Sequence, residues 1–485
     1  MAGIQSFGAY VPRLRLQRAA VHAANKWFAP GLGRLAKGER SMVNWDEDVV
    51  TMAVEAARDC LADRSREDIA TVMLASSSAP FADRQNSGIL KEALNLSDHV
   101  ATIDIGMSQK AGAGALLQAC RSASSGTVLV TASESRRARP ASEDELLNGD
   151  GAAAFVIGEG DGLARLVDSY SVSADFVDHF RPEGEEFDTG WEARWVRDEG
   201  YSKLAGNAIS GLLKQSGVDA SAISKLIVGI PGKGIAAGLA KRAGIAAEAV
   251  ADDLGAVMGS AGTAHPLVML AHSLETAKPG DLLLVLGFGQ GADVLLFEAT
   301  DAIGSVRPLL GASGWLERGR QEPNYMKYLS FAGHIQLELG KRAEFDQSPV
   351  LTALYRNRKT VLGLVGGRCT ETGTIQFPKT DISVNQNNPA IGTQEDYPLA
   401  EVPARVMSYT SDSLTFTLDP PNYYGMIDFE GGGRMLTEFT DVDPGQVAVG
   451  APMRMMFRVK SRDNRSGFVQ YFWKAVPTVG SDKNG

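Results

Sequence analysis

Apolar runs alternate with helix-spaced apolar positions along the first 300 residues, which predicts strands alternating with helices. In the first half the apolar runs predict strands at residues 3–11, 71–75, 127–132 and 149–158. Helical spacing marks residues 49–61, where Asp46 or Asp48 is placed to cap the helix start. Within residues 103–120 a strand turns directly into a helix of small residues. This order is typical of an α/β fold.

The same order of elements repeats in residues 166–300. A helix at residues 204–215 precedes the apolar segment LIVGIPGKG. A second helix start rich in small residues, GAVMGSAGTAHPLVML, precedes the strands in DLLLVLGFGQGADVLLFEAT. Two similar halves predict an internally duplicated α/β fold, whose two small-residue helix starts meet near a pseudo-twofold axis.

The pattern changes after residue 300. A connector that is partly helical at residues 332–342 leads into short segments from residue 359 onward, separated by frequent turns. These segments predict an all-β region that forms a small five-stranded barrel. We therefore predict four parts of the chain: 1–165, 166–300, 301–350 and 351–485.

Composition excludes several classes of function. The 485 residues are 44% apolar and 22% charged, as in a globular chain with about three domains. A net charge of −10 gives no electrostatic reason to bind nucleic acid or an anionic membrane. The chain has no signal-peptide pattern and no apolar run of roughly 18 residues, so we expect a cytoplasmic protein without a membrane partner. Cys60, Cys120 and Cys369 are too few and too scattered for a disulfide framework.

The helix start within residues 103–120 is suited to a nucleophile. Residues 111–115 carry little side-chain bulk, so protein can enclose the helix while its first N–H groups point into a site. Free amides and the helix dipole there stabilise a thiolate or a developing oxyanion. The residue at the turn is Gln109, whose amide is not a nucleophile.

Three segments carry a family resemblance. GAYVPR, KGERSMVNWDED and TMAVEAAR occur in this order near the N-terminus and resemble archaeal-type 3-hydroxy-3-methylglutaryl-CoA (HMG-CoA) synthases. The turn at Gln109 is similar to the nucleophile turn of HMG-CoA synthase and ketoacyl synthase III, in the thiolase superfamily. The C-terminal region resembles the OB-fold acyl-CoA-associated proteins found beside thiolases. The resemblance implies a duplicated thiolase fold followed by an OB-fold barrel.

The resemblance also implies four catalytic positions. Its cysteine nucleophile, acid/base glutamate, histidine and asparagine correspond to Gln109, Ser77, Gly229 and Ser260. We therefore predict that none of the four is intact. His265, in GTAHP, is the candidate substitute and is otherwise a packing residue at a helix start.

Other side chains offer no replacement for the missing thiol. Cys120 lies on the same helix as Gln109, roughly 16 Å away at 1.5 Å per residue. Ser77 and Ser108 are hydroxyls with no identifiable base. Lys233, in PGKG, is the candidate contact for a phosphate of coenzyme A.

Two further groups of residues have alternative interpretations. Arg136, Arg137 and Arg139 either meet a phosphate of coenzyme A or lie on a solvated surface or in a salt bridge across a dimer. The OB-fold relatives often begin with a zinc ribbon of two CxxC pairs, but here only Cys369 matches and Thr372 occupies its partner's position. A closed structural zinc site needs four ligands, so we predict no zinc.

Two classes of function remain open. In the first, the chain is a homodimeric subunit of a multicomponent acyltransferase, a scaffold and acyl-CoA channel for a catalytic thiolase partner. In the second it is an enzyme alone, either an HMG-CoA synthase-like condensing enzyme or a glutamine-type decarboxylase. Four replaced catalytic positions and a fused barrel favour the first class, and the charge argues against nucleic acid as a partner.

Overall fold

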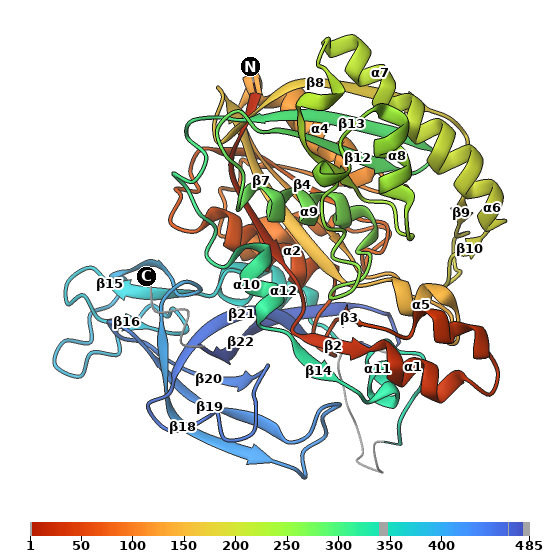
Figure 1. Ribbon diagram of the computed structural model, residues 1–485. Coiled ribbons are helices and arrows are strands. Elements are labelled where there is room, and N and C mark those ends of the chain that lie inside the picture. The colour runs from red at the N-terminus through yellow and green to blue at the C-terminus, as the bar shows by residue number, and fades with distance from the viewer. Residues whose placement is uncertain (1, 339–347, 464, 479–485) are drawn as a thin grey trace. The chain divides into compact units, whose positions relative to one another are not determined.

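The computed structural model describes residues 2–338, 348–463 and 465–478, and Figure 1 shows the course of the chain. These residues form two compact units. The first unit comprises the described parts of Met1–Asn44, Asp48–Gly88 and Ser97–His334. The second comprises the described parts of Trp45–Glu47, Ile89–Leu96 and Ile335–Gly485. The division at residues 165, 300 and 350 stays a prediction.

A nine-stranded sheet in the order β11-β12-β13-β8-β1-β7-β6-β4-β5 organises the first unit. Its strands are β1 (Ala2–Tyr10), β4 (Ile69–Ala75), β5 (Ala101–Ile105), β6 (Thr127–Glu134), β7 (Gly151–Glu159), β8 (Ala164–Ser173), β11 (Ile223–Val228), β12 (Leu282–Phe288) and β13 (Gly291–Ala299). Two small sheets join β2 (Leu14–Gln17), β3 (Glu39–Met42) and β14 (Arg320–Glu322), and β9 (His179–Phe180) with β10 (Thr189–Gly190).

Strand pairing shows the predicted duplication. In the first half β5, β4 and β6 are parallel, and β7 and β1 follow antiparallel. In the second half β11 and β12 are parallel, and β13 and β8 follow antiparallel. A fifth strand of the second half is reduced to one bridge, Leu226 with Val250. The internally duplicated α/β fold predicted from the sequence is confirmed.

Helices cover this sheet. The α-helices of the first unit include α1 (Arg18–Asn25), α2 (Val49–Leu61), α4 (Ala111–Ser122), α5 (Glu143–Leu147), α6 (Ala193–Trp195), α7 (Gly206–Ser216), α8 (Ile235–Ala243), α9 (His265–Leu274), α10 (Gly311–Glu317) and α11 (Tyr325–Phe331). Short 3₁₀-helices are η1 (Pro30–Leu35), η2 (Ala123–Ser125), η4 (Ala220–Ala222), η5 (Ala247–Ala249) and η6 (Gly262–Ala264), and η3 (Val196–Ala205) is a π-helix. α3 (Asn86–Ala93) lies where the chain passes between the units.

Asp48 fixes the start of α2. Its side chain accepts hydrogen bonds from the N–H groups of Val50 and Thr51 at 3.0 Å, and the Thr51 hydroxyl accepts from the Asp48 N–H at 2.8 Å. This reciprocal pair is a capping box. Of the two aspartates that the sequence offered as a cap, the structure uses Asp48.

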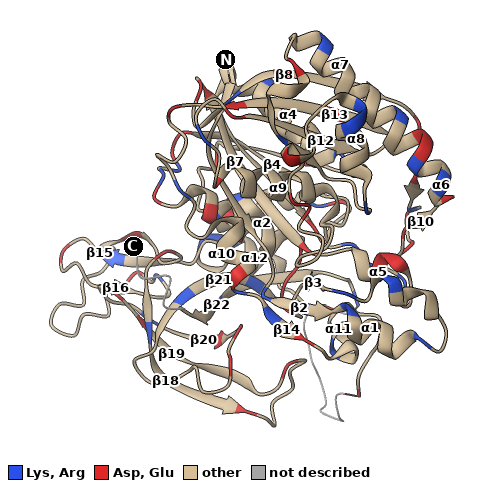
Figure 2. Ribbon diagram, in the orientation of Figure 1, with Lys and Arg blue, Asp and Glu red and all other residues tan. Residues whose placement is uncertain are grey.

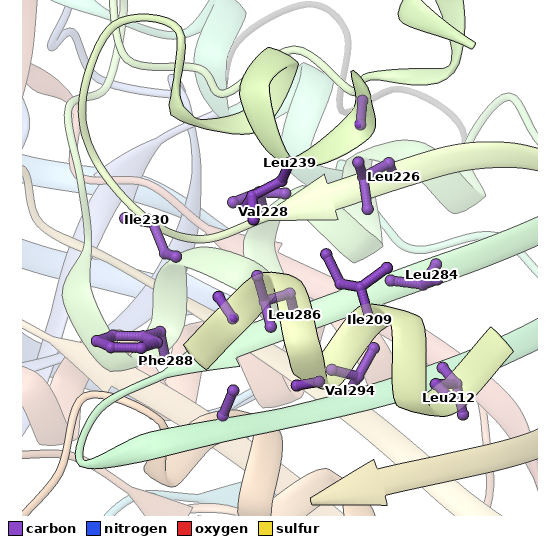
Figure 3. Close-up of a cluster of buried hydrophobic side chains, with 14 of the residues drawn as sticks. Ile209, Leu212, Leu226, Val228, Ile230, Leu239, Leu284, Leu286, Phe288 and Val294 are labelled. Carbon is purple, nitrogen blue, oxygen red and sulfur yellow. The ribbon is translucent and has the colours of Figure 1, made fainter. Parts of the chain in front are cut away.

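The second half has its own apolar core (Figure 3). Ile209 and Leu212 of α7 share this cluster with side chains from three strands of the sheet. Those strand residues include Leu226 and Val228 of β11, Leu284 and Leu286 of β12, and Val294 of β13. Each fully buried aliphatic side chain of this kind contributes about 1.5–3 kcal/mol. The core thus holds the sheet in the register that positions the β12–β13 turn.

The starts of α4 and η6 lie against each other. The Thr263 hydroxyl donates a 3.0 Å hydrogen bond to the carbonyl of Ser108. A Cβ atom at Gly112 would lie 2.2 Å from the carbonyl oxygen of Thr263. The backbones approach this closely because α4 begins with small residues. The predicted meeting of the two helix starts is confirmed.

The second unit contains a closed barrel in the order β18-β19-β20-β22-β21. Its strands are β18 (Ala404–Asp412), β19 (Asn422–Phe429), β20 (Arg434–Phe439), β21 (Pro452–Arg462) and β22 (Val469–Pro477). A three-stranded sheet precedes it, with β15 (Val365–Cys369), β16 (Ile375–Gln376) and β17 (Gln394–Pro398). The predicted five-stranded barrel is confirmed.

Two local predictions are wrong. The region after residue 359 does not begin as strand, because α13 (Arg358–Leu362) follows α12 (Leu351–Arg356). The end of α13 is held by the barrel, since the Trp473 indole donates a 2.7 Å hydrogen bond to the Leu362 carbonyl. The predicted helix at residues 332–342 is absent from residues 332–338, where a turn at residues 332–333 with Gly333 at φ +72° leads into a bend and then irregular chain. Its remainder lies outside the described residues.

Buried ion pairs lie inside the second unit. Arg458 contacts Glu47 at 3.2 Å and Asp441 at 3.1 Å, and Lys474 contacts Asp46 at 3.0 Å. Buried charges are tolerated when they are paired in this way. Elsewhere acidic and basic residues are interspersed along both units (Figure 2). Among the residues that the structure describes, no helix has the length and apolar character needed to cross a membrane.

Candidate functional site

The turn before α4 is held by the β12–β13 turn. The Ser108 hydroxyl donates a 2.9 Å hydrogen bond to the carbonyl of Gly289. A Cβ atom at Gly289 would lie 2.9 Å from the backbone nitrogens of both Gln109 and Lys110. Only glycine allows this approach without displacing the turn. The position of Gln109 is therefore determined by both halves of the duplicated fold.

Gln109 contacts Ser77 directly. Its Nε2 atom donates a 2.8 Å hydrogen bond to the Oγ atom of Ser77. Its Oε1 atom is buried and has no hydrogen-bond partner among the described residues. A Cβ atom at Gly262 would lie 2.4 Å from this oxygen, so the glycine makes room for the amide. The structure thus brings together two of the four predicted catalytic positions.

A buried carboxylate lies behind Ser77. Glu134 has no exposed surface, and its Oε2 atom accepts hydrogen bonds from the N–H and the hydroxyl of Ser77, both at 3.0 Å. Its Oε1 atom accepts from the hydroxyls of Ser76, at 3.5 Å, and Ser78. The prediction that Ser77 has no identifiable base is wrong.

Strand pairing explains how Glu134 reaches Ser77. β4 and β6 are parallel neighbours, and Ala75 pairs with Ala132. Ser77 and Glu134 each lie two residues further along: Ser77 just after β4 and Glu134 as the last residue of β6, at the same end of the two strands. Carboxyl ends of neighbouring parallel strands bring side chains together in this way. The contact between Ser77 and Glu134 could have been predicted from the sequence only with the knowledge that β4 and β6 are neighbours.

Two arginines lie near Ser77 at this end of β4 and β6. Arg136 Nε donates to Asp188 at 2.9 Å, Arg181 contacts the other oxygen of Asp188 at 3.1 Å, and Arg181 also donates to the Ser77 carbonyl. Burial lowers the pKa of Arg136, but the carboxylates of Asp188 and Glu134 outweigh burial and raise it above its ordinary value. Arg136 therefore remains cationic and tethers the segment that carries Asp188.

The neighbouring arginines also have contacts within the chain. Arg137 forms a 3.2 Å ion pair with Glu186, and the Arg139 guanidinium lies 5.0 Å from the ring centre of Phe187. Both contacts are made within one chain, so the phosphate contact and the salt bridge across a dimer both stay predictions. Lys233, the candidate phosphate contact, is exposed in the loop before α8.

The other two predicted catalytic positions have different surroundings. A Cβ atom at Gly229 would lie 2.7 Å from the ring of Pro266, so no side chain fits there without a shift. Ser260 is buried, and its backbone is hydrogen-bonded at 2.8 Å to Leu147 and to Gly149. Gly229 thus contacts α9 and, through a 3.3 Å hydrogen bond from its N–H to the Leu286 carbonyl, β12, whereas Ser260 contacts the end of α5 and the residues that follow it.

His265 packs at the start of α9. It is 3% exposed, and its Nδ1 atom accepts a 3.3 Å hydrogen bond from the Ala261 N–H. Burial lowers its pKa to about 4, so the imidazole is neutral near pH 7. This environment fits the packing alternative, and its role as a substitute catalytic residue stays a prediction.

The thiols of the first unit are buried and weakly acidic. Burial raises the pKa of Cys60 and of Cys120 to about 12. Cys120 lies in the last turns of α4, far along the helix from Gln109. A nucleophilic cysteine needs a lowered pKa and access to substrate. Cys60 and Cys120 have raised pKa values and are buried, so both thiols lack both properties.

Cys369 lies in β15 of the second unit. Its Sγ atom is 3.2 Å from the Thr393 hydroxyl, and hydrogen bonds from Thr372 and Thr393 lower its pKa to about 6. Among the described residues, no group of three or more His, Cys, Asp or Glu side chains is placed to hold a metal ion. The absence of zinc stays a prediction.

Comparison with known proteins relates both parts of the chain to families. A family model of the 3-oxoacyl-[acyl-carrier-protein] synthase III C terminal matches residues 213–295. A model of the C-terminal OB-fold domain of ChsH2 matches residues 397–458. Hydroxymethylglutaryl-CoA synthase of Aeropyrum pernix is 30% identical over 344 residues, which are 69% of this chain and 95% of the relative. The enzyme of Methanothermobacter thermautotrophicus is 28% identical over 350 residues, which are 70% of this chain and all of the relative.

Solved structures share the fold of a large part of this chain. A crystal structure of HMG-CoA synthase complexed with CoA has a TM-score of 0.61 at 18% identity, covering 72% of this chain and 95% of that chain. The 3-oxoacyl-[acyl-carrier-protein] synthase III of Aquifex aeolicus has a TM-score of 0.53 at 18% identity, covering 61% of this chain and all of that chain. The predicted resemblance to the thiolase superfamily, and to an OB-fold domain after it, is confirmed.

Proposed function

Because this chain belongs to the hydroxymethylglutaryl-CoA synthase family, we propose that it is an acyl-CoA-binding subunit of an acyltransferase assembly. In this assembly a separate thiolase-fold protein supplies the thiol nucleophile. The present chain serves as scaffold and acyl-CoA channel. The single observation that carries the proposal is the Gln109 amide, hydrogen-bonded to Ser77 at the helix start where the family resemblance implies a cysteine.

The chemistry of Gln109 supports an assisting role. A carboxamide nitrogen has no basic lone pair, so it cannot carry an acyl group through a covalent intermediate. The hydrogen bond to Ser77 also fixes the amide instead of leaving it free to turn. Cys60 and Cys120 are buried with raised pKa values, so they do not replace the missing thiolate.

Family relationship supports coenzyme A as the ligand. The similar HMG-CoA synthase was solved in complex with CoA. We propose that this chain binds acyl-CoA at the start of α4, beside Gln109. Lys233 is exposed before α8 and is the proposed contact for a phosphate group. Acyl-CoA is a substrate or ligand here, and no covalently bound cofactor is proposed.

The barrel supports a role beside a partner. Its relatives include the OB-fold domain of ChsH2, which matches residues 397–458. We propose that the barrel covers the partner's site and excludes water during acyl transfer. Pro420, Pro421, Tyr423 and Tyr424 are the proposed apolar corner for a pantetheine arm or a partner surface.

A second candidate function is catalysis by this chain alone. The observation that favours it is the Glu134 carboxylate hydrogen-bonded to Ser77, which provides an ionisable group beside Gln109. On this alternative the chain is an HMG-CoA synthase-like condensing enzyme with altered chemistry or a glutamine-type decarboxylase. Conversion of malonyl-CoA to acetyl-CoA by the purified chain tests the decarboxylase.

Co-purification followed by reconstitution tests the proposed function. The tagged full-length chain is recovered from its native host, and bound proteins are identified by mass spectrometry. We expect a thiolase-fold protein with an intact cysteine, whose acyl transfer requires this chain. Synthesis of HMG-CoA from acetyl-CoA and acetoacetyl-CoA by the isolated chain would contradict the proposal.

A further inference from the structure

We propose that Ser77 and Glu134 form a proton relay that removes and returns a proton at the α-carbon of a bound acyl-CoA thioester. This inference rests on the acyl-CoA binding of the proposed function. It does not rest on the catalytic partner. It assigns to the site an acid/base group from β6, because residue 77, two positions after the end of β4, is a serine.

Burial separates the roles of the two residues. Glu134 has no exposed surface, whereas Ser77 is half-buried. A ligand at the start of α4 reaches the Ser77 hydroxyl before it reaches the carboxylate. The 3.0 Å hydrogen bond between Ser77 Oγ and Glu134 Oε2 connects that hydroxyl to the base. A proton can therefore pass to Glu134 through Ser77.

The hydrogen-bond directions fix the hydroxyl proton. Ser77 Oγ accepts from the Nε2 atom of Gln109, which is a donor. The hydroxyl proton of Ser77 consequently points to Glu134, and a lone pair of Oγ stays free for an incoming C–H group. Gln109 thus acts as a positioning residue, holding Ser77 in the orientation that the relay needs.

The surroundings keep Glu134 in place. Its carboxylate accepts hydrogen bonds from the Ser77 N–H at 3.0 Å and from the hydroxyls of Ser76 and Ser78. The cationic Arg136 interacts with it electrostatically. Fixed donors around a buried carboxylate hold it ready for reaction without further reorganisation.

The proposed step needs no other reactant. Ser77 Oγ takes the α-proton of the thioester while its own proton passes to Glu134 Oε2. The electron pair of the broken C–H bond forms the C=C bond of the enolate, and the carbonyl pair moves onto the thioester oxygen. Reversal returns a proton to the α-carbon. In deuterated water the returned hydron is a deuteron, so the step appears as exchange.

Hydrogen exchange of acetyl-CoA in deuterated water tests the relay. The folded full-length chain is incubated with acetyl-CoA, and deuterium in the acetyl group is measured by mass spectrometry. We expect exchange with the natural chain. We expect at least a 100-fold loss in Glu134→Gln and in Ser77→Ala, because general acid–base groups contribute about 10²–10⁴-fold.

A rescue variant separates catalysis from structural support. The double variant Ser77→Glu/Glu134→Gln restores a carboxylate at residue 77. We expect its exchange rate to be at least tenfold higher than that of Glu134→Gln. Glu145→Gln is the matched control, since Glu145 is equally buried but lies in α5, hydrogen-bonded to Tyr325 at 2.8 Å. We expect it to exchange at the natural rate.

Separate measurements distinguish the two proposals. Binding of acetyl-CoA is measured by calorimetry on the same samples. Saturating binding without exchange would overturn the relay and leave the proposed function intact. Full exchange in folded Glu134→Gln would also overturn the relay. Absence of acetyl-CoA binding would overturn both, whereas exchange without any thiolase-fold partner in the host would overturn only the partner role.

Discussion

The hydroxyl of Thr263 donates a hydrogen bond of 3.0 Å to the carbonyl of Ser108, one residue before Gln109. This contact joins η6 in the second half of the duplicated fold to the turn before α4 in the first half. The position of the candidate site consequently depends on how closely these two backbones approach.

Gly112→Ala should disturb that approach. The added Cβ atom would lie 2.2 Å from the Thr263 carbonyl oxygen, so backbone must move. We expect the free energy of unfolding to fall by about 1–3 kcal/mol, as for other overpacked sites. Urea denaturation of the full chain measures this change.

Gly114→Ala is the control on the same helix. Its Cβ atom would lie 3.5 Å from Asp293 Oδ2, an ordinary contact distance. Alanine is also the better helix former by about 0.5–1 kcal/mol. Equal destabilisation by the two alanines would show that close approach at residue 112 is not the cause.

The natural chain should form no covalent acyl intermediate. Intact-mass spectrometry after incubation with acetyl-CoA or acetoacetyl-CoA should show an unchanged mass, because Gln109 provides no nucleophile. An acetyl adduct that maps to Cys120 or to a serine would refute this expectation.

Restoring the thiol should not restore HMG-CoA synthesis. In Gln109→Cys the positions corresponding to the family's histidine and asparagine remain Gly229 and Ser260, so the groups that would stabilise the enolate and the oxyanion are still absent. We expect no measurable HMG-CoA by chromatography. HMG-CoA synthesis by this variant would contradict the prediction, because it would show that the thiol is the only missing group that the reaction needs.

Stability should depend on pH through His265. Burial lowers the pKa of its imidazole to about 4 from an ordinary 6.5, so the unfolded chain binds this proton more readily. The contribution is fully present above pH 6.5 and decreases as the pH falls toward 4, by about 1.4 kcal/mol per pH unit. Urea denaturation at pH 6.5 and 5 should therefore show a drop larger by about 2 kcal/mol in the natural chain than in His265→Gln.

His99→Gln is the control for this measurement, because His99 is exposed. It should keep the pH dependence of the natural chain. If His265→Gln also keeps it, the imidazole of His265 is not responsible.

The two lysines that share Glu438 should differ in their contribution to stability. Lys474 is buried and contacts Glu438 at 2.9 Å and Asp46 at 3.0 Å, whereas the side chain of Lys460 is 49% exposed. Lys474→Met leaves the buried Asp46 without this partner, and we expect a loss of about 3–5 kcal/mol. Lys460→Met should cost less than about 1 kcal/mol.

Chemical denaturation of the two variants makes the comparison. Similar losses in Lys474→Met and Lys460→Met would contradict the assignment of Lys474 as a structural ion-pair partner.

We expect a homodimer joined at β5. This strand is the last of the nine-stranded sheet, and Ile103 on it is 41% exposed. An open strand edge can pair with its copy about a twofold axis. Light scattering should give twice the monomer mass of 51.6 kDa, and Ile103→Lys should shift the population toward monomer. A natural chain that is monomeric at micromolar concentration would rule out the dimer.

The sequence predicted the fold more completely than the candidate site. Apolar periodicity was enough for the duplicated halves and the barrel, because it records burial residue by residue. The partnership of Ser77 with Glu134 was missed, since it depends on which strands are neighbours and on their register. The helix at Arg358–Leu362 was missed because five residues are too few for a periodic signal, and its end is held by Trp473, 111 residues away.

The single bridge between Leu226 and Val250 has a consequence for how copies of the chain accumulate. The Ala251 N–H donates a 3.0 Å hydrogen bond to the Leu226 carbonyl, so residues 250–251 occupy the outer side of β11 at that point. A fibre grows by sheet extension only if every copy has an unpaired edge strand on both sides of its sheet, here β11 and β5. Residues 250–251 obstruct the β11 end of the sheet at one point, and the expected dimer would use the β5 end. We therefore expect association through the sheet to stop at the dimer, and a concentrated solution of the protein to resist strand-mediated polymerisation.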